Sequence, residues 1–292
     1  MRTFEGIYTP LITFFDAKYR VDTQAQQRHV SNLLNAGVAG LVPMASMGEF
    51  TSMEREERRR VAEAVIEEAS GRAKVVVGTG APSTRQAVEL SKDAEAAGAD
   101  GVMVITPFYI KPRREGLKSH YEAIHEAVEI PVMAYSLPSF TGVDIPVELI
   151  LEMAHAGTID GLKDSSGDLS KAMHVITEMP ETFSFMTGSD SLLASVVIHG
   201  GQGGVVGSSN VFPSQGVRLY DLLQKWRVEE AVDLQLRLAR FVRALQVGTF
   251  PAAAKYLVEK VWGLTAHSRP PVSELSSQEK RKIMEIVAPL MQ

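Results

Sequence analysis

The chain contains no cysteine among its 292 residues. Disulfide bonds, thiolate zinc sites and cysteine nucleophiles are therefore all excluded. The absence of cysteine is also compatible with a reducing compartment, and we predict that the protein is cytoplasmic.

Long apolar runs and basic clusters are missing as well. No run of ~18 apolar residues occurs, and the first residues, MRTFEGIYTP, lack the charged and apolar regions of a signal peptide. The formal net charge is −5, and no block rich in Lys and Arg stands out, so a surface for nucleic acid or membrane is not indicated. We expect a small-molecule ligand.

The residues that are present are sufficient for a large hydrophobic core. Hydrophobic residues make up 45% of the chain and charged residues 22%, which is typical of globular proteins. The length fits either two modest domains or one α/β barrel, because barrels of ~250 residues are ordinary single domains.

Short runs of β-branched and apolar residues predict eight strands. They are residues 6–15, 40–44, 74–80, 101–107, 131–136, 160–166, 183–188 and 203–209. Between them, apolar residues recur at the three- and four-residue intervals of a helix, and capping-box patterns at residues 51–54 and 83–86 mark two helix starts. Because no run stands out as an edge strand, we predict an α/β fold of the (β/α)8 TIM barrel type.

The strand pattern stops near Val228, and three further helical segments follow. We predict a barrel over residues 1–224 and a C-terminal three-helix extension over residues 225–292. No flexible linker separates the two parts, so we expect them to form one structural unit.

One lysine, Lys163, lies at a predicted strand end, in the stretch GLKDSSGD. Active sites of such barrels lie at the carboxyl ends of the strands. An amine held in a desolvated pocket has a lowered pKa and can attack a carbonyl to form a Schiff base. Two alternatives stay open: Lys163 pairs with Asp164, or its side chain reaches out of the barrel mouth.

Two further strand ends offer groups that suit such chemistry. Tyr135 can move protons if its hydroxyl reaches the carbon that the amine attacks, although it can equally fill the end of the barrel. Ser46 to Gly48 precede a predicted helix, so their backbone N–H groups can receive a carboxylate. Many strand-to-helix turns look similar, so this second pattern is not specific.

Metal and nucleotide patterns are not found. The seven histidines are scattered, and the closest pair is five residues apart, on different faces of a helix. The glycine-rich stretches at residues 78–83 and 199–207 lack both the P-loop lysine and the full G-x-G-x-x-G spacing. We therefore expect neither a metal nor a cofactor.

Four motifs occur in order along the chain: ASMGE, TPFY, YSLPSFTG and GLKDSSGD. With them the chain resembles the dihydrodipicolinate synthase and N-acetylneuraminate lyase family of Schiff-base aldolases over nearly all its length. The resemblance implies a barrel with a helical tail, assembled as a homotetramer from tight dimers. It also implies that Lys163 forms an imine with pyruvate or another 2-oxo acid, and that Tyr135 is the acid/base.

The same resemblance assigns roles to other residues. Ser46 matches a relay hydroxyl, and Tyr109 matches a tyrosine that reaches across the tight dimer into the neighbouring site. The backbone amides of Met47 and Gly48 are expected to hold the carboxylate. The remaining predicted substrate contacts are Phe140, Ser165 and Val206, although Ser165 and its neighbour can instead cap the next helix.

Departures from the family pattern narrow the substrate. Dihydrodipicolinate synthases have an arginine at the position of Phe140, and Met47 replaces their second hydroxyl. Arg55 and Arg58 stand where some members have the histidines of lysine feedback. These differences disfavour lysine biosynthesis.

The motifs look most like those of 4-hydroxy-2-oxoglutarate aldolase and the 2-keto-3-deoxy sugar-acid aldolases. We predict a pyruvate-dependent class I aldolase that cleaves or forms a 4-hydroxy-2-oxo acid or a 2-keto-3-deoxy sugar acid. The alternatives are a 2-keto-3-deoxy acid dehydratase that uses the same imine, a dihydrodipicolinate synthase, and a non-catalytic sugar-acid binding protein.

Overall fold

Eight parallel strands close a barrel in the computed structural model, which describes residues 3–290. Each strand pairs with the next along the chain, and β8 pairs with β1. The strands are β1 (Gly6–Pro10), β2 (Gly40–Val42), β3 (Lys74–Gly78), β4 (Gly101–Ile105), β5 (Val132–Ser136), β6 (Gly161–Asp164), β7 (Ser184–Thr187) and β8 (Gly203–Val205). The predicted (β/α)8 TIM barrel is confirmed.

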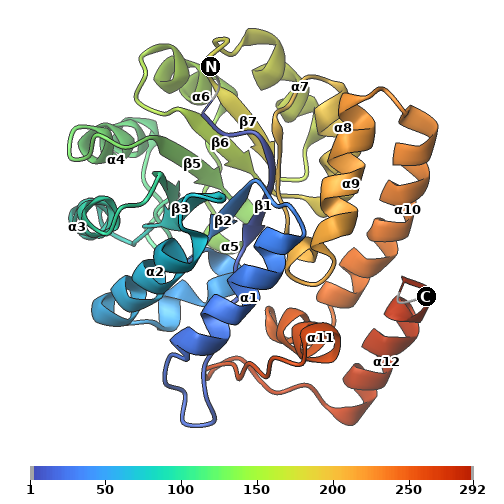
Figure 1. The fold of residues 1–292 in the computed structure, drawn as a ribbon. Helices are drawn as coiled ribbons and strands as arrows, with labels where there is room; N and C mark the ends of the chain where they lie inside the picture. Colours follow the sequence, from blue (N-terminus) through green and yellow to red (C-terminus); the bar gives the residue numbers. More distant parts are fainter. Residues whose placement is uncertain (1–2, 291–292) are drawn as a thin grey trace.

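Helices surround the barrel (Figure 1). They are α1 (Thr23–Asn35), α2 (Arg55–Ala69), α3 (Thr84–Ala96), α4 (Arg114–His125), α5 (Pro138–Thr141), α6 (Val147–His155), α7 (Leu169–Glu178), α8 (Leu193–Ile198) and α9 (Pro213–Gln224). Because helices cover the outer face and side chains fill the interior, strands such as β4 and β5 are buried at every position. This explains why they appear in the sequence as continuous apolar runs.

Three helices extend the barrel at its C-terminal end: α10 (Val228–Leu245), α11 (Ala252–Trp262) and α12 (Ser277–Val287). One buried cluster joins them to the barrel, since Ile12 and Met47 pack with Phe241, Leu257 and Ile283. The predicted helical extension is confirmed. The boundary after residue 224 stays a prediction, and residues 1–2 and 291–292 of the predicted ranges lie outside the described part.

Several predicted strands are too long at their carboxyl ends. β1 ends at Pro10 rather than at residue 15, and β8 ends at Val205 rather than at residue 209. The chain leaves the sheet there and turns into loops and short 3₁₀ helices, such as Gly207–Asn210 after β8. The residues that were predicted as strand but lie beyond these strand ends therefore form the mouth of the barrel.

One of the two predicted helix caps is confirmed. Ser83 accepts a hydrogen bond from the Gln86 amide at 3.4 Å at the start of α3. The cap at residues 51–54 is wrong, because α2 is capped by Glu54 together with Glu57. Here a carboxylate, rather than the Thr51 hydroxyl, accepts from the first turn of the helix.

Candidate active site

Lys163 and Tyr135 are direct neighbours in the barrel. β5 and β6 pair with Tyr135 opposite Lys163, so the two side chains project from the same face of the sheet. Each residue is 4% exposed, and the Lys163 Nζ lies 3.9 Å from the centroid of the Tyr135 ring. The strand register thus places the predicted nucleophile against the predicted acid/base.

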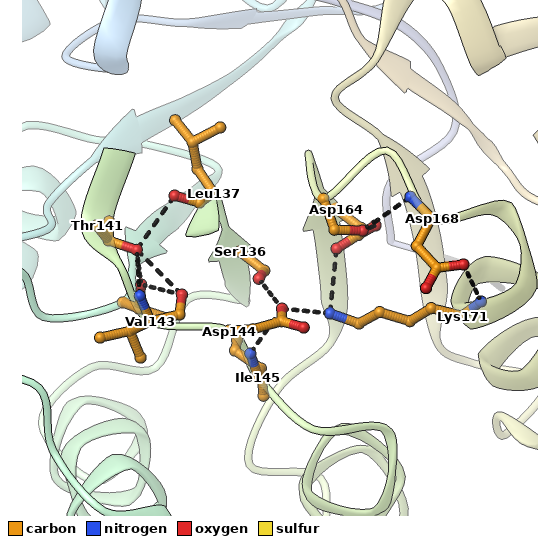
Figure 2. A network of polar contacts seen from close by, with 11 residues as sticks. Ser136, Leu137, Thr141, Val143, Asp144, Ile145, Asp164, Asp168 and Lys171 are labelled. Carbon is orange, nitrogen blue, oxygen red and sulfur yellow. Dashed lines mark hydrogen bonds and ion pairs between the residues drawn. The ribbon is translucent and has the colours of Figure 1, made fainter. Parts of the chain in front are cut away.

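Asp164 does not pair with Lys163. Alternation along β6 turns Asp164 to the opposite face, where its carboxylate lies 3.4 Å from the Lys171 Nζ and accepts from Ser166 at 2.6 Å. Figure 2 shows Lys171 between Asp164 and Asp144, with which it forms a second ion pair. Because Lys163 is also buried, both alternatives to a reactive amine in the barrel are wrong.

The turn after β2 contains a short 3₁₀ helix, Ser46–Gly48. The Gly48 amide donates to the Ala45 carbonyl at 2.9 Å, so it is less available to a carboxylate, and its assignment stays a prediction. In the part of the chain that is described, the amides of Ser46 and Met47 donate to no protein acceptor. These two N–H groups, at the start of the turn, are the better candidates for the anion site.

A cavity of about 450 Å³ opens at this end of the barrel, a size suited to a small-molecule ligand. Its lining includes the predicted residues Ser46, Met47, Tyr135, Phe140, Lys163 and Ser165. The other lining residues are Pro10, Leu137, Gly188, Ser189, Asp190, Val205, Gly207, Val242, Leu245, Gln246, Gly248 and Phe250. The structure thus brings the predicted amine, hydroxyl groups and carboxylate-binding turn around one space.

Ser165 faces this cavity and does not cap the following helix. α7 is capped by Asp168, whose carboxylate accepts from the Lys171 amide at 3.0 Å. A β-carbon at Gly188 would lie 1.9 Å from the Ser165 Oγ and 2.9 Å from the Lys163 Cε. Because Gly188 has no side chain, the space beside it is open to the side chains of Ser165 and Lys163.

Two predicted site residues lie away from this cavity. Val206 is buried in the cluster that Ile7 and Leu219 share, and the adjacent Val205 lines the cavity instead. Val206 follows the end of β8, and its assignment as a substrate contact stays a prediction. Tyr109, in the loop after β4, is 89% exposed, and its role in a neighbouring subunit stays a prediction.

Asp190 was not singled out by the sequence, although it follows a strand. Its carboxyl group accepts from the amides of Gly207 at 3.1 Å and Ser208 at 2.9 Å. Burial raises the pKa of this carboxyl. Asp190 thus ties the loop after β7 to the loop after β8, a contact for which the sequence carries no local signal.

The end of α10 and the segment after it also line the cavity. Val242, Leu245 and Gln246 come from this helix and its C-cap, followed by Gly248 and Phe250. Helical periodicity shows that α10 is amphipathic, but it cannot show which end of the barrel the helix covers. These residues therefore escaped prediction.

Residues 3–290 contain neither a candidate metal site nor a candidate membrane span. No group of three or more His, Asp or Glu side chains in that range could hold a metal ion. None of the helices in the same range has the length and apolarity that crossing a bilayer requires.

Comparison with known proteins gives matches over nearly the whole chain. The sequence model of the Dihydrodipicolinate synthetase family matches residues 3–290. The 4-hydroxy-tetrahydrodipicolinate synthase of Methanopyrus kandleri is 37% identical over 278 residues, which cover 94% of this chain and 93% of that protein. The enzyme of the same name from Methanococcoides burtonii is 36% identical, with 95% of each chain covered.

Solved structures agree with the sequence comparison. A prophage protein of the dihydrodipicolinic acid synthase family from E. coli K12, in complex with pyruvate, gives a TM-score of 0.95 at 30% identity, with 99% of both chains covered. The dihydrodipicolinate synthase from Aquifex aeolicus gives a TM-score of 0.95 at 28% identity, with 99% of this chain and 98% of that chain covered.

Proposed function

Because this chain belongs to the dihydrodipicolinate synthetase family of Schiff-base-forming lyases, we propose that it is a pyruvate-dependent class I aldolase. Its substrate is a 4-hydroxy-2-oxo acid or a 2-keto-3-deoxy sugar acid, which it cleaves or forms. The observation that supports this most strongly is the buried amine of Lys163, 3.9 Å from the centroid of the Tyr135 ring.

In the proposed mechanism the Lys163 amine attacks the C2 carbonyl of the substrate, and loss of water gives an imine. The substrate carboxylate accepts from the amides of Ser46 and Met47, which are fixed by the turn before substrate binds. The imine draws electrons from the C3–C4 bond, so that bond breaks when the 4-hydroxyl loses its proton. An aldehyde leaves, and an enamine remains on Lys163.

Proton transfers complete the cycle. Tyr135 takes the proton of the 4-hydroxyl, with Ser46 as the relay hydroxyl, and returns a proton to C3 of the enamine. Water then hydrolyses the imine, which releases pyruvate and restores the free amine. Both side chains line the same cavity as Lys163, which is what such a relay requires.

A dehydratase acting through the same imine is a second candidate, since Lys163 and Tyr135 serve both reactions. The products separate the two. The aldolase releases pyruvate and an aldehyde, whereas the dehydratase expels water and gives a saturated 2-oxo aldehyde or semialdehyde.

The names of the sequence relatives favour 4-hydroxy-tetrahydrodipicolinate synthase as a third candidate. The position where such enzymes are expected to carry an arginine is Phe140, which lines the cavity and is 60% exposed. A neutral ring cannot pair with a second carboxylate, so we rank this candidate below the aldolase.

The proposal is tested by incubating the protein with a panel of 4-hydroxy-2-oxo acids and measuring pyruvate and aldehyde together. We expect wild type to form pyruvate and aldehyde in equal amounts. The variant Lys260→Ala, at an exposed lysine of α11, should do the same. Lys163→Ala should form neither. Turnover of pyruvate with aspartate semialdehyde, without aldolase activity, would favour the synthase instead, and no turnover at all would favour a binding protein.

We also propose a cytoplasmic homotetramer, a dimer of dimers. Support comes from Tyr109 and Ile110, two large side chains that are 89% and 73% exposed next to each other. Exposed apolar groups of this size are typical of a surface that a partner covers.

A further inference from the structure

The lining of the cavity offers few charged groups. Of the described residues that line it, only Lys163 has a basic side chain and only Asp190 an acidic one. Lys163 is used by the proposed imine, and the carboxyl group of Asp190 accepts from the amides of Gly207 and Ser208. A carboxylate on the aldehyde half of the substrate would therefore have no cation of this chain beside it.

Arg269 is close by but already fully engaged. It lines an adjoining cavity of about 300 Å³ that shares Phe140 and Phe250 with the first. Its guanidinium donates to the Tyr19 carbonyl at 2.6 Å and forms an ion pair with Glu57. Moving Arg269 towards a substrate would break these contacts, so it is not a free anion site.

A second group of cations belongs to a separate groove. Arg240, Arg243 and Lys282 line a space of about 950 Å³ bounded by α10 and α12. This groove meets the cavity at Gln246 and Gly248. None of the three cations is part of the cavity lining.

The outer part of the cavity is instead aromatic. The rings of Phe140 and Phe250 meet edge to face, with centroids 5.5 Å apart and an interplanar angle of 80°. Leu137, Val242 and Leu245 also line the cavity and add apolar surface. Such a wall suits an uncharged carbon skeleton, because a carboxylate placed against it loses its hydration without gaining a partner.

We propose that the aldehyde half of the substrate is uncharged and lies against Phe140 and Phe250. This inference rests on the proposed aldolase function. It narrows the 4-hydroxy-2-oxo acids to those whose only carboxylate is the one held by Ser46 and Met47. A substrate with a second carboxylate, such as 4-hydroxy-2-oxoglutarate, is thereby disfavoured.

The test uses matched aldehydes in the condensation with pyruvate. The pairs are benzaldehyde with 4-carboxybenzaldehyde, and butanal with succinic semialdehyde; glyceraldehyde adds a hydroxylated, uncharged arm. We expect kcat/KM to be at least about tenfold higher for the uncharged member. Comparison of the aromatic, aliphatic and hydroxylated aldehydes then shows which carbon skeleton binds best against Phe140 and Phe250.

Trapping of the pyruvate imine in the same preparation keeps the two proposals distinct. If the imine forms but no uncharged aldehyde is consumed faster than the carboxylated ones, the inference about charge is overturned while the imine stands. If the imine itself does not form, the proposed function fails first.

Two variants at one position separate charge from the loss of a ring. Phe140→Arg places a cation in the aromatic wall and should shift the ratio of kcat/KM values towards the carboxylated aldehydes by at least about tenfold. Phe140→Gln removes the ring without adding charge and should not give that shift. Equal ratios in the two variants would contradict the proposal.

Discussion

At the residue scale, the position of the Lys163 amine depends on a neighbour that has no side chain. A β-carbon at Gly188 would meet the Lys163 Cε at 2.9 Å and the Ser165 Oγ at 1.9 Å. Neither distance is compatible with ordinary contact, so both side chains would have to move. A shift of this kind removes the amine from the geometry that attack on a carbonyl requires.

We therefore predict that Gly188→Ala lowers kcat/KM by ~100-fold or more, together with the rate of imine formation. Gly116→Ala is the control, because a β-carbon there would lie 3.6 Å from its nearest neighbour, the Pro112 Cβ. Wild-type rates of pyruvate trapping in Gly188→Ala would show that the amine does not need this space.

His120 provides a second test at this scale, for stability rather than activity. The residue is 1% exposed, its Nδ1 lies 3.0 Å from the Thr84 hydroxyl, and burial lowers its pKa to about 4. An unfolded histidine has a pKa near ~6.5. Between these values the unfolded chain binds a proton that the folded chain does not, so stability is lost as the pH falls from 6.5 towards 4.

We predict that wild type loses about 2 kcal/mol more unfolding free energy between pH 7 and 5 than His120→Gln. Urea unfolding at both pH values measures the difference. His125→Gln, at an exposed residue of α4, should behave as wild type. Parallel pH profiles for wild type and His120→Gln would rule out this origin of acid sensitivity.

Residue types and strand ends were enough to predict that Lys163, Tyr135 and Ser46 lie around one space, because the barrel brings all strand ends to one side. Their roles in catalysis stay predictions. The hydrogen bond of the Gly48 amide to the Ala45 carbonyl depends on backbone geometry, so the sequence could not show that this amide already has an acceptor. The predicted strand 203–209 ends at Val205 instead, so which side of the chain Val206 presents could not be read from the sequence pattern.

At the element scale, α11 supports the turn that is proposed to hold the substrate carboxylate. Lys255 of this helix is 2% exposed and forms an ion pair with Glu49, the residue that follows the Ser46–Gly48 turn. Its Nζ also donates to the His267 carbonyl at 2.6 Å, and burial lowers the pKa of Lys255 to about 8. The extension therefore fixes a loop of the barrel mouth.

We predict that Lys255→Met destabilises the protein by about 3–5 kcal/mol, because Glu49 is left buried without its cation. It should also raise KM for pyruvate, since the turn that Glu49 ends is no longer held. Denaturant unfolding and steady-state kinetics measure the two effects. The double variant with Glu49→Gln should recover most of the stability, and Lys260→Met on the same helix is the exposed control.

Loss of stability without any change in KM would show that Lys255 acts on the fold alone.

The sequence predicted α11 as a helix, but not this role. A lysine in an amphipathic helix gives no sign that its amine will be buried, and the contact joins residues 206 positions apart in the chain. Long-range ion pairs of this kind need the folded structure.

At the scale of the whole molecule, the closed barrel with its helical extension could be predicted because each local pattern agreed with it. Eight apolar runs, helices between them and no evident edge strand leave few other topologies. An arrangement of subunits cannot be predicted in this way from one chain. Within the chain, Tyr109 is exposed and lies away from the cavity.

We predict a tetramer in which Tyr109 completes the site of a neighbouring subunit. Native mass spectrometry measures the number of chains. Mixing the inactive variants Lys163→Ala and Tyr109→Ala should restore part of the activity, because each mixed dimer contains one site with both residues intact. A fully active monomer, or no recovery under conditions that exchange subunits, would contradict this assembly.

The central claim is that Lys163 forms an imine with pyruvate. Incubation with pyruvate and borohydride, followed by intact-mass measurement and peptide mapping, tests it directly. We expect each wild-type chain to gain one reduced pyruvate, attached at Lys163, and Lys163→Ala to gain none. No adduct on wild type, or the same adduct on Lys163→Ala, would contradict the claim.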